Sequence, residues 1–211
     1  MELVKYLVDI YGYDTPIFLK DIRIGRKSKS AIKEEFYRAV KSGEIERESN
    51  GIYFVRSEKE FGSGVSFNDI IESKFIYSDN CIENYKELYI EGYYSGLTFL
   101  NILHISEQVP AIREITTNKT SAKKRYFSSN GCVAIIRKGR TNITFQNYKI
   151  LQFLDSFYFM SEDDIKDKKE ILISYIKNNG FTKEELKRYI SLYSSKTINK
   201  ILNEDIFNAF K

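Results

Sequence analysis

The N-terminal part of the chain alternates apolar and polar residues with the spacing of α-helices. One apolar stripe runs through residues 3–11, and another begins near Ser30 and ends before Gly43. Between them, residues 16–22 carry a shorter apolar stripe. The pattern therefore predicts three helices, with Ser30 as the N-cap of the third helix and Gly43 as its left-handed terminator.

A β-hairpin is predicted directly after the third helix. Residues 44–47 and 52–55 have the composition of strands, and Asn50-Gly51 between them favours a tight turn. Three helices followed by a hairpin are typical of a winged helix-turn-helix domain, which binds duplex DNA. Some winged helices bind only proteins, so a winged-helix module that neutralises a partner by direct binding is the alternative function.

Positive charge is concentrated where such a domain would meet DNA. Residues 20–41 hold eight Lys/Arg and three acidic residues, although the net charge of the whole chain is only +4. The same charges are also typical of a solvated helix face, but cations at a helix start attract phosphate groups. We expect phosphate contacts from Arg23, Arg26, Lys27 and Lys29. We expect major-groove contacts from Ser30, Lys33, Glu34, Tyr37, Arg38 and Lys41, and contacts of the hairpin with the flanking backbone from Arg47 and Tyr53.

The predicted fold class is α+β, with three parts. A polar, glycine-rich stretch over residues 58–64 indicates a boundary, so we expect a winged helix-turn-helix domain over 1–57, an α+β domain over 65–158 and a helical segment over 159–211. The elements expected in the middle part are helices over 67–75 and 145–158, a loop over 78–84, strands over 88–91, 112–117, 124–127 and 132–138, and a helix that buries Leu97, Leu100, Ile102 and Leu103. Thr144 is the expected cap of the helix over 145–158, and Asn130-Gly131 predicts a second hairpin turn. The helical runs expected in the last part cover residues 162–179, 182–193 and 195–210.

Charge changes sign along the middle of the chain. Residues 57–107 have three Lys/Arg and nine acidic residues, whereas residues 108–158 have nine Lys/Arg and two acidic residues. This second basic surface would continue the DNA footprint, face an acidic protein or RNA, or consist of solvated hairpin tips. Its members are Lys119, Lys123, Lys124, Arg125, Arg137, Lys138 and Arg140. We expect the neighbouring Tyr126 and Phe127 in the core.

Groups that would indicate catalysis are few. The single histidine, His104, lies in an apolar stretch and is expected to be a core residue. Asp163 and Asp164 resemble acidic residues at a helix start, and Cys81 and Cys132 have neither a CxxC partner nor a neighbouring base. We therefore expect no catalytic residues, no metal site and no cofactor. Without a signal segment or a membrane-length apolar run, we expect a cytoplasmic protein that does not contact a membrane.

The order of several segments resembles one known family. A winged helix, then GYYSGLTFLNILHISEQVPAIREITTN, then ITFQNYKILQFLDSF, is similar to the AbiEi-like antitoxins and transcriptional regulators of type IV toxin–antitoxin systems, over about residues 1–158. Residues 160–211 do not map onto the motifs of that family. The residues that carry the resemblance are Gly92, Gly96, Leu97, Leu100, Gln108, Pro110, Thr116, Thr117, Asn118, Thr144, Asn147, Leu151, Leu154 and Asp155.

The resemblance implies a DNA-binding antitoxin that represses its own toxin–antitoxin operon. Its partners would be double-stranded DNA, as an inverted repeat in its own promoter bound by a homodimer, and a cognate nucleotidyltransferase-like toxin, counteracted directly or functionally. The helices after residue 159 would then form a satellite bundle, a dimer contact or the surface that counteracts the toxin.

Overall fold

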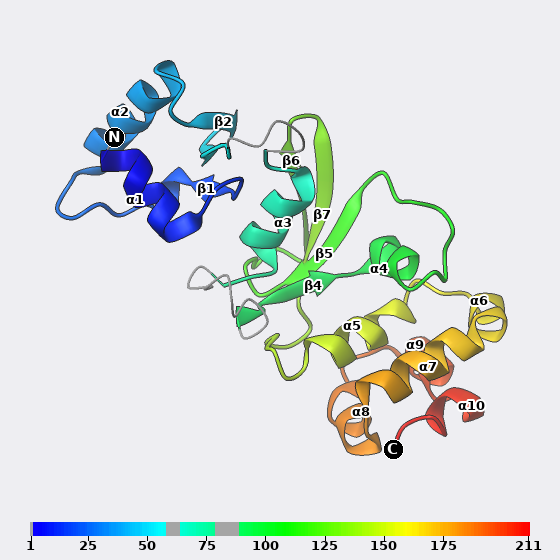
Figure 1. Ribbon diagram of the computed structural model, residues 1–211. Helices are drawn as coiled ribbons and strands as arrows, with labels where there is room; N and C mark the ends of the chain where they lie inside the picture. Colours follow the sequence, from blue (N-terminus) through cyan, green and yellow to red (C-terminus); the bar gives the residue numbers. More distant parts are fainter. Residues whose placement is uncertain (1, 58–63, 79–88) are drawn as a thin grey trace. The chain divides into compact units, whose positions relative to one another are not determined.

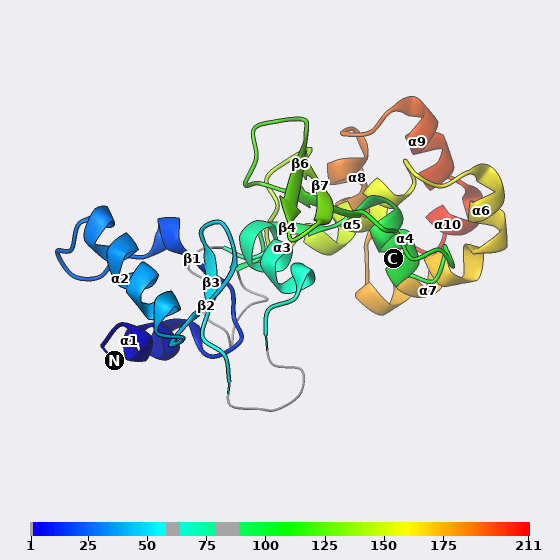
Figure 2. The same cartoon turned by 90° about the horizontal axis from the view of Figure 1, so that it is seen from above.

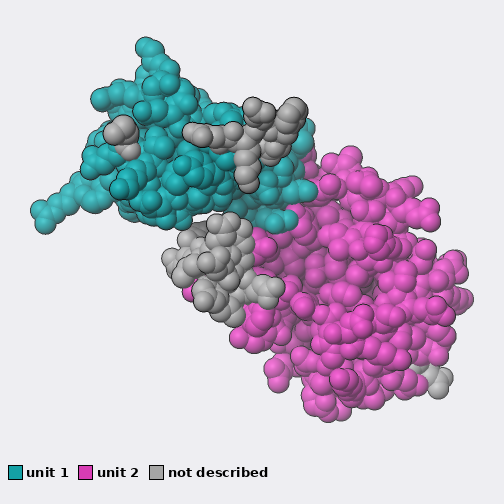
Figure 3. All heavy atoms as spheres, in the orientation of Figure 1, with its two compact units in different colours: residues 1–73, 129–132 teal, residues 74–128, 133–211 magenta. Residues whose placement is uncertain are grey.

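The structure, a computed structural model, describes residues 2–57, 64–78 and 89–211. Over these residues the fold is mixed α+β, as predicted, with ten α-helices and two small sheets. Backbone contacts divide the chain into two compact units, coloured separately in Figure 3. Unit 1 comprises residues 1–73 and 129–132, and unit 2 comprises residues 74–128 and 133–211.

Besides residues 67–73 of a helix that continues into unit 2, the described part of unit 1 contains two helices and a three-stranded sheet (Figures 1 and 2). Its elements are α1 (Glu2–Tyr11), β1 (Ile17–Phe18), the 3-10 turn η1 (Leu19–Asp21), α2 (Lys29–Lys41), β2 (Glu46–Ser49) and β3 (Ile52–Phe54). The strand order is β1-β3-β2, and both strand pairs are antiparallel. The turn predicted at Asn50-Gly51 connects β2 to β3.

The two helices and the sheet of unit 1 enclose one apolar core. Leu7 of α1 and Phe36 of α2 have no exposed surface, and Ile32 of α2 is 3% exposed. The ring of Phe36 packs edge-on against Tyr53 of β3, with centroids 5.0 Å apart. Complete burial of a side chain of this size contributes about 1.5–3 kcal/mol. The apolar faces predicted for these two helices are therefore confirmed.

Capping residues fix both ends of α2. The Oγ of Ser28 accepts a hydrogen bond from the Ala31 amide at 3.2 Å, so Ser28 is the N-cap. The prediction that Ser30 caps the helix is wrong, because Ser30 is the second residue of α2 and is exposed. At the other end, Gly43 has a φ of 78°, as predicted for a glycine that terminates a helix.

The short helix predicted over residues 16–22 is not present. Strand β1 and turn η1 occupy this range. Ile17 pairs with Tyr53 and Phe18 with Ile52, so the strand is specified by pairing with residues about 35 positions away. Local spacing contains no information about such a partner, and a two-residue strand has no periodicity of its own.

Unit 2 is built on a four-stranded sheet with the order β4-β5-β7-β6. The strands are β4 (Gly92–Tyr94), β5 (Arg113–Thr117), β6 (Lys124–Ser129) and β7 (Cys132–Lys138), and helix α4 (Gly96–Ile102) follows β4. β4 and β5 are antiparallel, whereas β5 and β7 are parallel. The parallel register places Thr116 opposite Arg137. The predicted turn at Asn130-Gly131 is confirmed, since both residues have positive φ.

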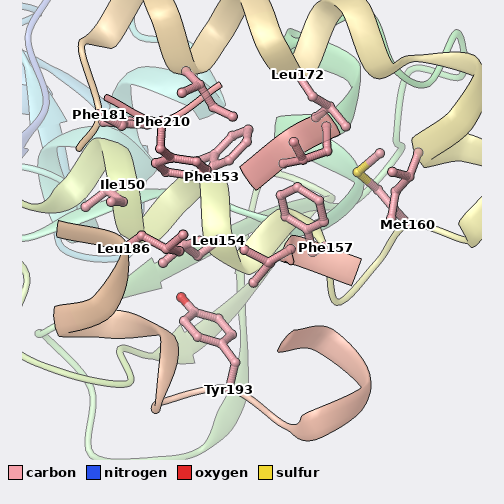
Figure 4. Close-up of a cluster of buried hydrophobic side chains, with 14 of the residues drawn as sticks. Ile150, Phe153, Leu154, Phe157, Met160, Leu172, Phe181, Leu186, Tyr193 and Phe210 are labelled. Carbon is pink, nitrogen blue, oxygen red and sulfur yellow. The ribbon is translucent and has the colours of Figure 1, made fainter. Parts of the chain in front are cut away.

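Six helices follow the sheet and share one core, drawn in Figure 4. They are α5 (Tyr148–Ser156), α6 (Glu162–Asp167), α7 (Lys169–Asn179), α8 (Lys183–Ile190), α9 (Ser195–Ile201) and α10 (Glu204–Phe207). Phe153 of α5 contacts the rings of Phe157, Phe181 and Phe210. The residues after 159 therefore bury their apolar faces on α5 within unit 2, which differs from the separate helical segment expected from the sequence.

Several local predictions for unit 2 are also wrong. Of the strand expected over residues 88–91, Leu88 lies outside the described residues and Ile90 forms only an isolated β-bridge with Tyr77, while the strand itself is Gly92–Tyr94. The N-cap of α5 is Asn147 rather than Thr144. Leu97 and Ile102, expected to be buried, are 48% and 51% exposed, because the seven-residue α4 buries only one side.

Helix α3 (Phe67–Phe75), which spans the boundary between the units, has the predicted bounds. Most of the predicted boundary stretch over 58–64, most of the predicted loop over 78–84, and Cys81 lie outside the described residues.

Candidate functional site

Helix α2 presents one polar face to solvent. The residues predicted for groove contacts are all exposed: Ser30, Lys33, Glu34, Tyr37, Arg38 and Lys41. Ile32, Phe36 and Ala39 lie on the opposite face and are at most 5% exposed. The helix is thus held by its apolar face while the whole polar face stays available, and Tyr37 stands at its middle with 62% of its surface exposed.

Three of the predicted DNA-binding cations make contacts within unit 1. Nζ of Lys27 lies 2.7 Å from Oε1 of Glu35, and Nε of Arg38 lies 3.4 Å from Oε1 of Glu34. Nη1 of Arg23 donates to the Ile22 carbonyl at 2.8 Å. These cations therefore already interact with protein oxygen atoms.

The remaining cations of this region are exposed and unpaired. Among the described residues, none forms a hydrogen bond or an ion pair with Arg26, Lys29, Lys33 or Lys41 through its side chain. Arg26 lies in the connection before α2 and the three lysines lie on α2 itself. We call these four residues the α2 basic face. An unpaired cation on the surface of a protein attracts phosphate without first giving up a partner.

The two residues predicted for the wing differ in their exposure. Arg47 of β2 is exposed, and its Nη2 donates to Oδ1 of Asn50 at 3.1 Å. Tyr53 is only 8% exposed and belongs to the core, so its predicted contact with DNA is wrong. It lies in the central strand of the sheet, whose three residues are all buried. The continuous apolar run over residues 52–55 is the signal of a strand buried on both faces.

The second basic group separates into two sets. Arg137 and Lys138 end β7, Arg140 lies two residues beyond it, and together with Lys123 they line one cavity of about 630 Å³ in unit 2. The other lining residues are Thr116, Ser121, Gly139, Asp155, Tyr158, Phe159 and Ser194. We call this site the unit 2 cavity.

Lys119, Lys124 and Arg125 do not line the cavity. Nζ of Lys124 lies 5.2 Å from the ring centroid of Tyr126, and Arg125 lies 5.3 Å from the ring centroid of Phe75. The expectation that Tyr126 is a core residue is wrong, since 64% of its surface is exposed. Lys124 and Arg125 are exposed on β6, whereas Lys119 is half-buried in the connection before that strand.

Two buried carboxylates position the arginines of the cavity. Oε2 of Glu114 accepts hydrogen bonds from Nε and Nη2 of Arg137 at 3.0 and 2.8 Å. Oδ1 of Asp155 accepts one from Nε of Arg140 at 3.0 Å. Glu114 and Asp155 are each 7% exposed. Neither carboxylate was predicted as an arginine partner, although they are the only two acidic residues between 108 and 158.

Asp155 also accepts a hydrogen bond from the hydroxyl group of Tyr93. The distance from the Tyr93 oxygen to Oδ2 of Asp155 is 2.8 Å. Burial, and next the negative charge of Asp155, raise the pKa of Tyr93 well above its ordinary value. Tyr93 therefore stays protonated and donates, so that both oxygens of Asp155 have a partner within unit 2.

None of the described residues considered for catalysis lines the unit 2 cavity. His104 is exposed and has a φ of 58°, so the expectation of a core histidine in a helix is wrong. Asp164 accepts hydrogen bonds from the amide and hydroxyl of Ser161, which makes it part of a helix-capping box. Cys132 is exposed. Within the described ranges, no group of three or more His, Cys, Asp or Glu residues could hold a metal ion.

None of the helices described here has the length and apolar character needed to span a membrane. No family model, curated protein or solved structure matches the chain.

Proposed function

We propose that unit 1 is a winged helix-turn-helix domain that binds double-stranded DNA, with α2 as the helix that enters the major groove. The single observation that carries the proposal is the α2 basic face: four exposed, unpaired cations, three along α2 and Arg26 just before it, on a helix whose other face is fixed in a core. Such a helix reaches the bottom of a major groove with its side chains while its backbone stays in place.

The order of elements in unit 1 supports this proposal. A helix, a short strand, a turn, a helix and a hairpin follow one another, and the hairpin forms an antiparallel sheet with the short strand. In a winged helix the hairpin stands beside the recognition helix and touches the neighbouring DNA backbone. Arg47, exposed on β2, is the hairpin residue suited to that contact.

The α2 basic face sets the expected electrostatic contribution. A protein that neutralises Z phosphates binds duplex DNA with a slope of log K against log salt of about −0.9Z. Four cations in contact with phosphates would give a slope of about −3.6 for one copy of the chain. Lys27 and Arg38 would add less, because each is already close to a glutamate of α2.

The test is a fluorescence-anisotropy titration of labelled promoter DNA from the chain's own operon, repeated over a range of salt concentrations. The variant R26A/K29A/K33A should bind more weakly, with a slope less steep by about 2.7. The matched control is K166A/K177A/K187A, which removes the same charge from exposed positions on α6, α7 and α8. An unchanged slope for the first variant, or an equal change for the control, would refute the assignment.

We also propose a wider role for the chain as an antitoxin that represses its own operon and counteracts a nucleotidyltransferase-like toxin. The support for this role is the resemblance of residues 1–158 to AbiEi-like antitoxins, and it implies a cytoplasmic location and an inverted repeat as operator. Co-expression with the adjacent gene product tests the role, since growth should be restored by the intact chain. If a tagged chain instead co-purifies with a protein that binds α2, the protein-interaction function replaces DNA binding.

A further inference from the structure

We propose that the unit 2 cavity binds a nucleoside phosphate, either as a free nucleotide or as the phosphorylated end of a single strand. The proposal does not depend on DNA binding by unit 1, because every lining residue belongs to unit 2. The volume of about 630 Å³ lies within the range of small-molecule sites, about 300–1,000 Å³. The cavity is therefore large enough for a base and a sugar as well as for phosphate groups.

The charge of the lining favours an anion. Among the lining residues that the structure describes, Lys123, Arg137, Lys138 and Arg140 are cationic and only Asp155 is acidic. Lys123 and Lys138 are exposed and, among the residues that the structure describes, have no hydrogen-bond or ion-pair partner for their ammonium groups. Unpaired ammonium groups beside a cavity lower the energy of a bound polyanion without loss of an existing contact.

The two arginines are fixed in place and still have donor groups available. Glu114 accepts from Nε and Nη2 of Arg137, which leaves Nη1 of that guanidinium without a partner in the described structure. Asp155 accepts from Nε of Arg140 and the Leu192 carbonyl accepts from its Nη1, which leaves Nη2. A guanidinium held by a buried carboxylate loses little conformational entropy when it binds a phosphate oxygen.

The sheet topology brings these groups together. β5 and β7 are parallel neighbours, and their register places Thr116 beside Arg137 at the carboxyl ends of both strands. Gly139 and Arg140 follow directly after β7. Ligands of open sheets with parallel strands bind at the carboxyl ends of the strands, where the loops diverge. The unit 2 cavity lies at that place.

The lining also contains aromatic surface, which distinguishes a nucleotide from a simple phosphate. Tyr158 and Phe159 follow α5, and their rings are 5.0 Å apart. Tyr158 is 61% exposed, so one ring is free to stack on a base, and stacking on an aromatic ring is tolerant of base identity. The guanidinium of Arg137 lies 5.7 Å from the ring centroid of Phe159, which places the phosphate-binding and base-binding groups side by side.

Equilibrium binding to the full chain tests the proposal, with a fluorescently labelled nucleoside triphosphate as the probe. Unlabelled competitors are the four nucleoside triphosphates, a short 5′-phosphorylated single-stranded RNA, inorganic tripolyphosphate and an acidic peptide. We expect displacement by the triphosphates or by the RNA, and the better competitor identifies the source of the ligand. K123A/K138A should weaken binding by about tenfold or more per lysine, since a hydrogen bond to a charged group is lost at each position.

Two matched variants complete the experiment. K166A/K187A removes two exposed lysines outside the cavity and should bind like the unaltered chain, as should R26A/K29A/K33A of unit 1. Y158A should weaken binding of the nucleotide but not of tripolyphosphate. The proposal is overturned if no probe binds at millimolar concentration, if tripolyphosphate or the acidic peptide binds as tightly as the nucleotide, or if K123A/K138A binds unchanged while its thermal unfolding matches that of the unaltered chain.

Discussion

Replacement of Gly96 by alanine should destabilise unit 2 through a contact with Glu114. Gly96 has a φ of 58°, and a Cβ atom there would lie 2.5 Å from Oε1, 2.6 Å from Cδ and 2.9 Å from Oε2 of Glu114. The left-handed conformation costs a residue with a Cβ about 1–2 kcal/mol. The carboxylate must also move, which disturbs its two hydrogen bonds with Arg137.

The cost of disturbing the Glu114–Arg137 ion pair depends on how deeply the pair is buried. Loss of a fully buried pair costs about 3–5 kcal/mol. The side chains of Glu114 and Arg137 are 10% and 30% exposed, so solvent reduces this loss. We therefore expect disturbance of the ion pair to cost about 2–3 kcal/mol. G96A should therefore destabilise the folded chain by about 3–5 kcal/mol in total. For a unit of this size, each kcal/mol lowers Tm by about 3–5 °C.

Gly180 supplies the matched control within the same unit. It has a φ of 67° at the end of α7, and the nearest atom to an added Cβ is Nζ of Lys211 at 3.8 Å. G180A should therefore lower the free energy of unfolding only by the cost of the left-handed backbone conformation, about 1–2 kcal/mol. Thermal unfolding followed by circular dichroism should place the Tm of G96A about 6–15 °C below that of G180A.

A double-mutant cycle separates the clash from the backbone strain. In the E114A background no carboxylate remains for the added Cβ to displace. The destabilisation caused by G96A should then fall to that caused by G180A. The coupling energy between the two positions should be about 2 kcal/mol. A G96A variant no less stable than G180A, or a destabilisation by G96A that is the same with and without the carboxylate of Glu114, would refute the proposed contact.

Two further predictions concern a corrected residue and a capping residue. Y53F should leave both the stability and the DNA affinity nearly unchanged, because Tyr53 acts through its ring in the core. Y53A should lower the free energy of unfolding, measured with denaturant, by about 3–5 kcal/mol. Weaker DNA binding by a stable Y53F variant would instead place Tyr53 at the DNA interface. The hydrogen bonds from the Ser161 amide and hydroxyl lower the pKa of Asp164, so its stabilising effect exists above the ordinary aspartate pKa of about 3.9 and disappears as the pH falls through the lowered value. D164A should then be about 1 kcal/mol less stable at pH 7, and the difference should shrink below about pH 4; a difference independent of pH would contradict this account.

Local signals in the sequence predicted the parts of the fold that depend on neighbours in the chain. The helix over residues 67–75 and the turns at Asn50-Gly51 and Asn130-Gly131 follow from side-chain spacing and backbone preferences within a few residues. The polar face of α2 was predicted for the same reason, since 3.6-residue periodicity separates its two faces. Ser28 also precedes the apolar stripe of α2, so it could have been identified from the sequence as the N-cap of that helix.

The parts that sequence reasoning missed depend on pairing over long distances. β1 exists because Ile17 meets Tyr53, and the cavity exists because the parallel register of β5 and β7 joins Thr116 to Arg137. Asp155 accepts from Tyr93, which is 62 positions away. Nothing in the residues near position 155 specifies that partner. The basic composition of residues 108–158 left a DNA footprint, an acidic protein or RNA partner, and solvated hairpin tips as alternatives, and only the topology shows which four cations share the cavity.

Carboxylates near the cations act differently at the two sites because their burial differs. On α2, Glu34 and Glu35 are the acidic residues that neutralise Arg38 and Lys27, and these pairs are solvated, with side chains 30–72% exposed. A solvated pair is worth about 0–1 kcal/mol, so in the proposed complex with DNA a phosphate would replace the glutamate beside Lys27 at little cost. In unit 2 the side chain of Glu114 is 10% exposed, so a ligand cannot displace it from Arg137 without leaving a buried charge unpaired. The same kind of pair therefore leaves the surface of α2 adaptable but fixes the geometry of the cavity. For this reason we expect the proposed nucleotide site to be more selective than the proposed DNA-binding face.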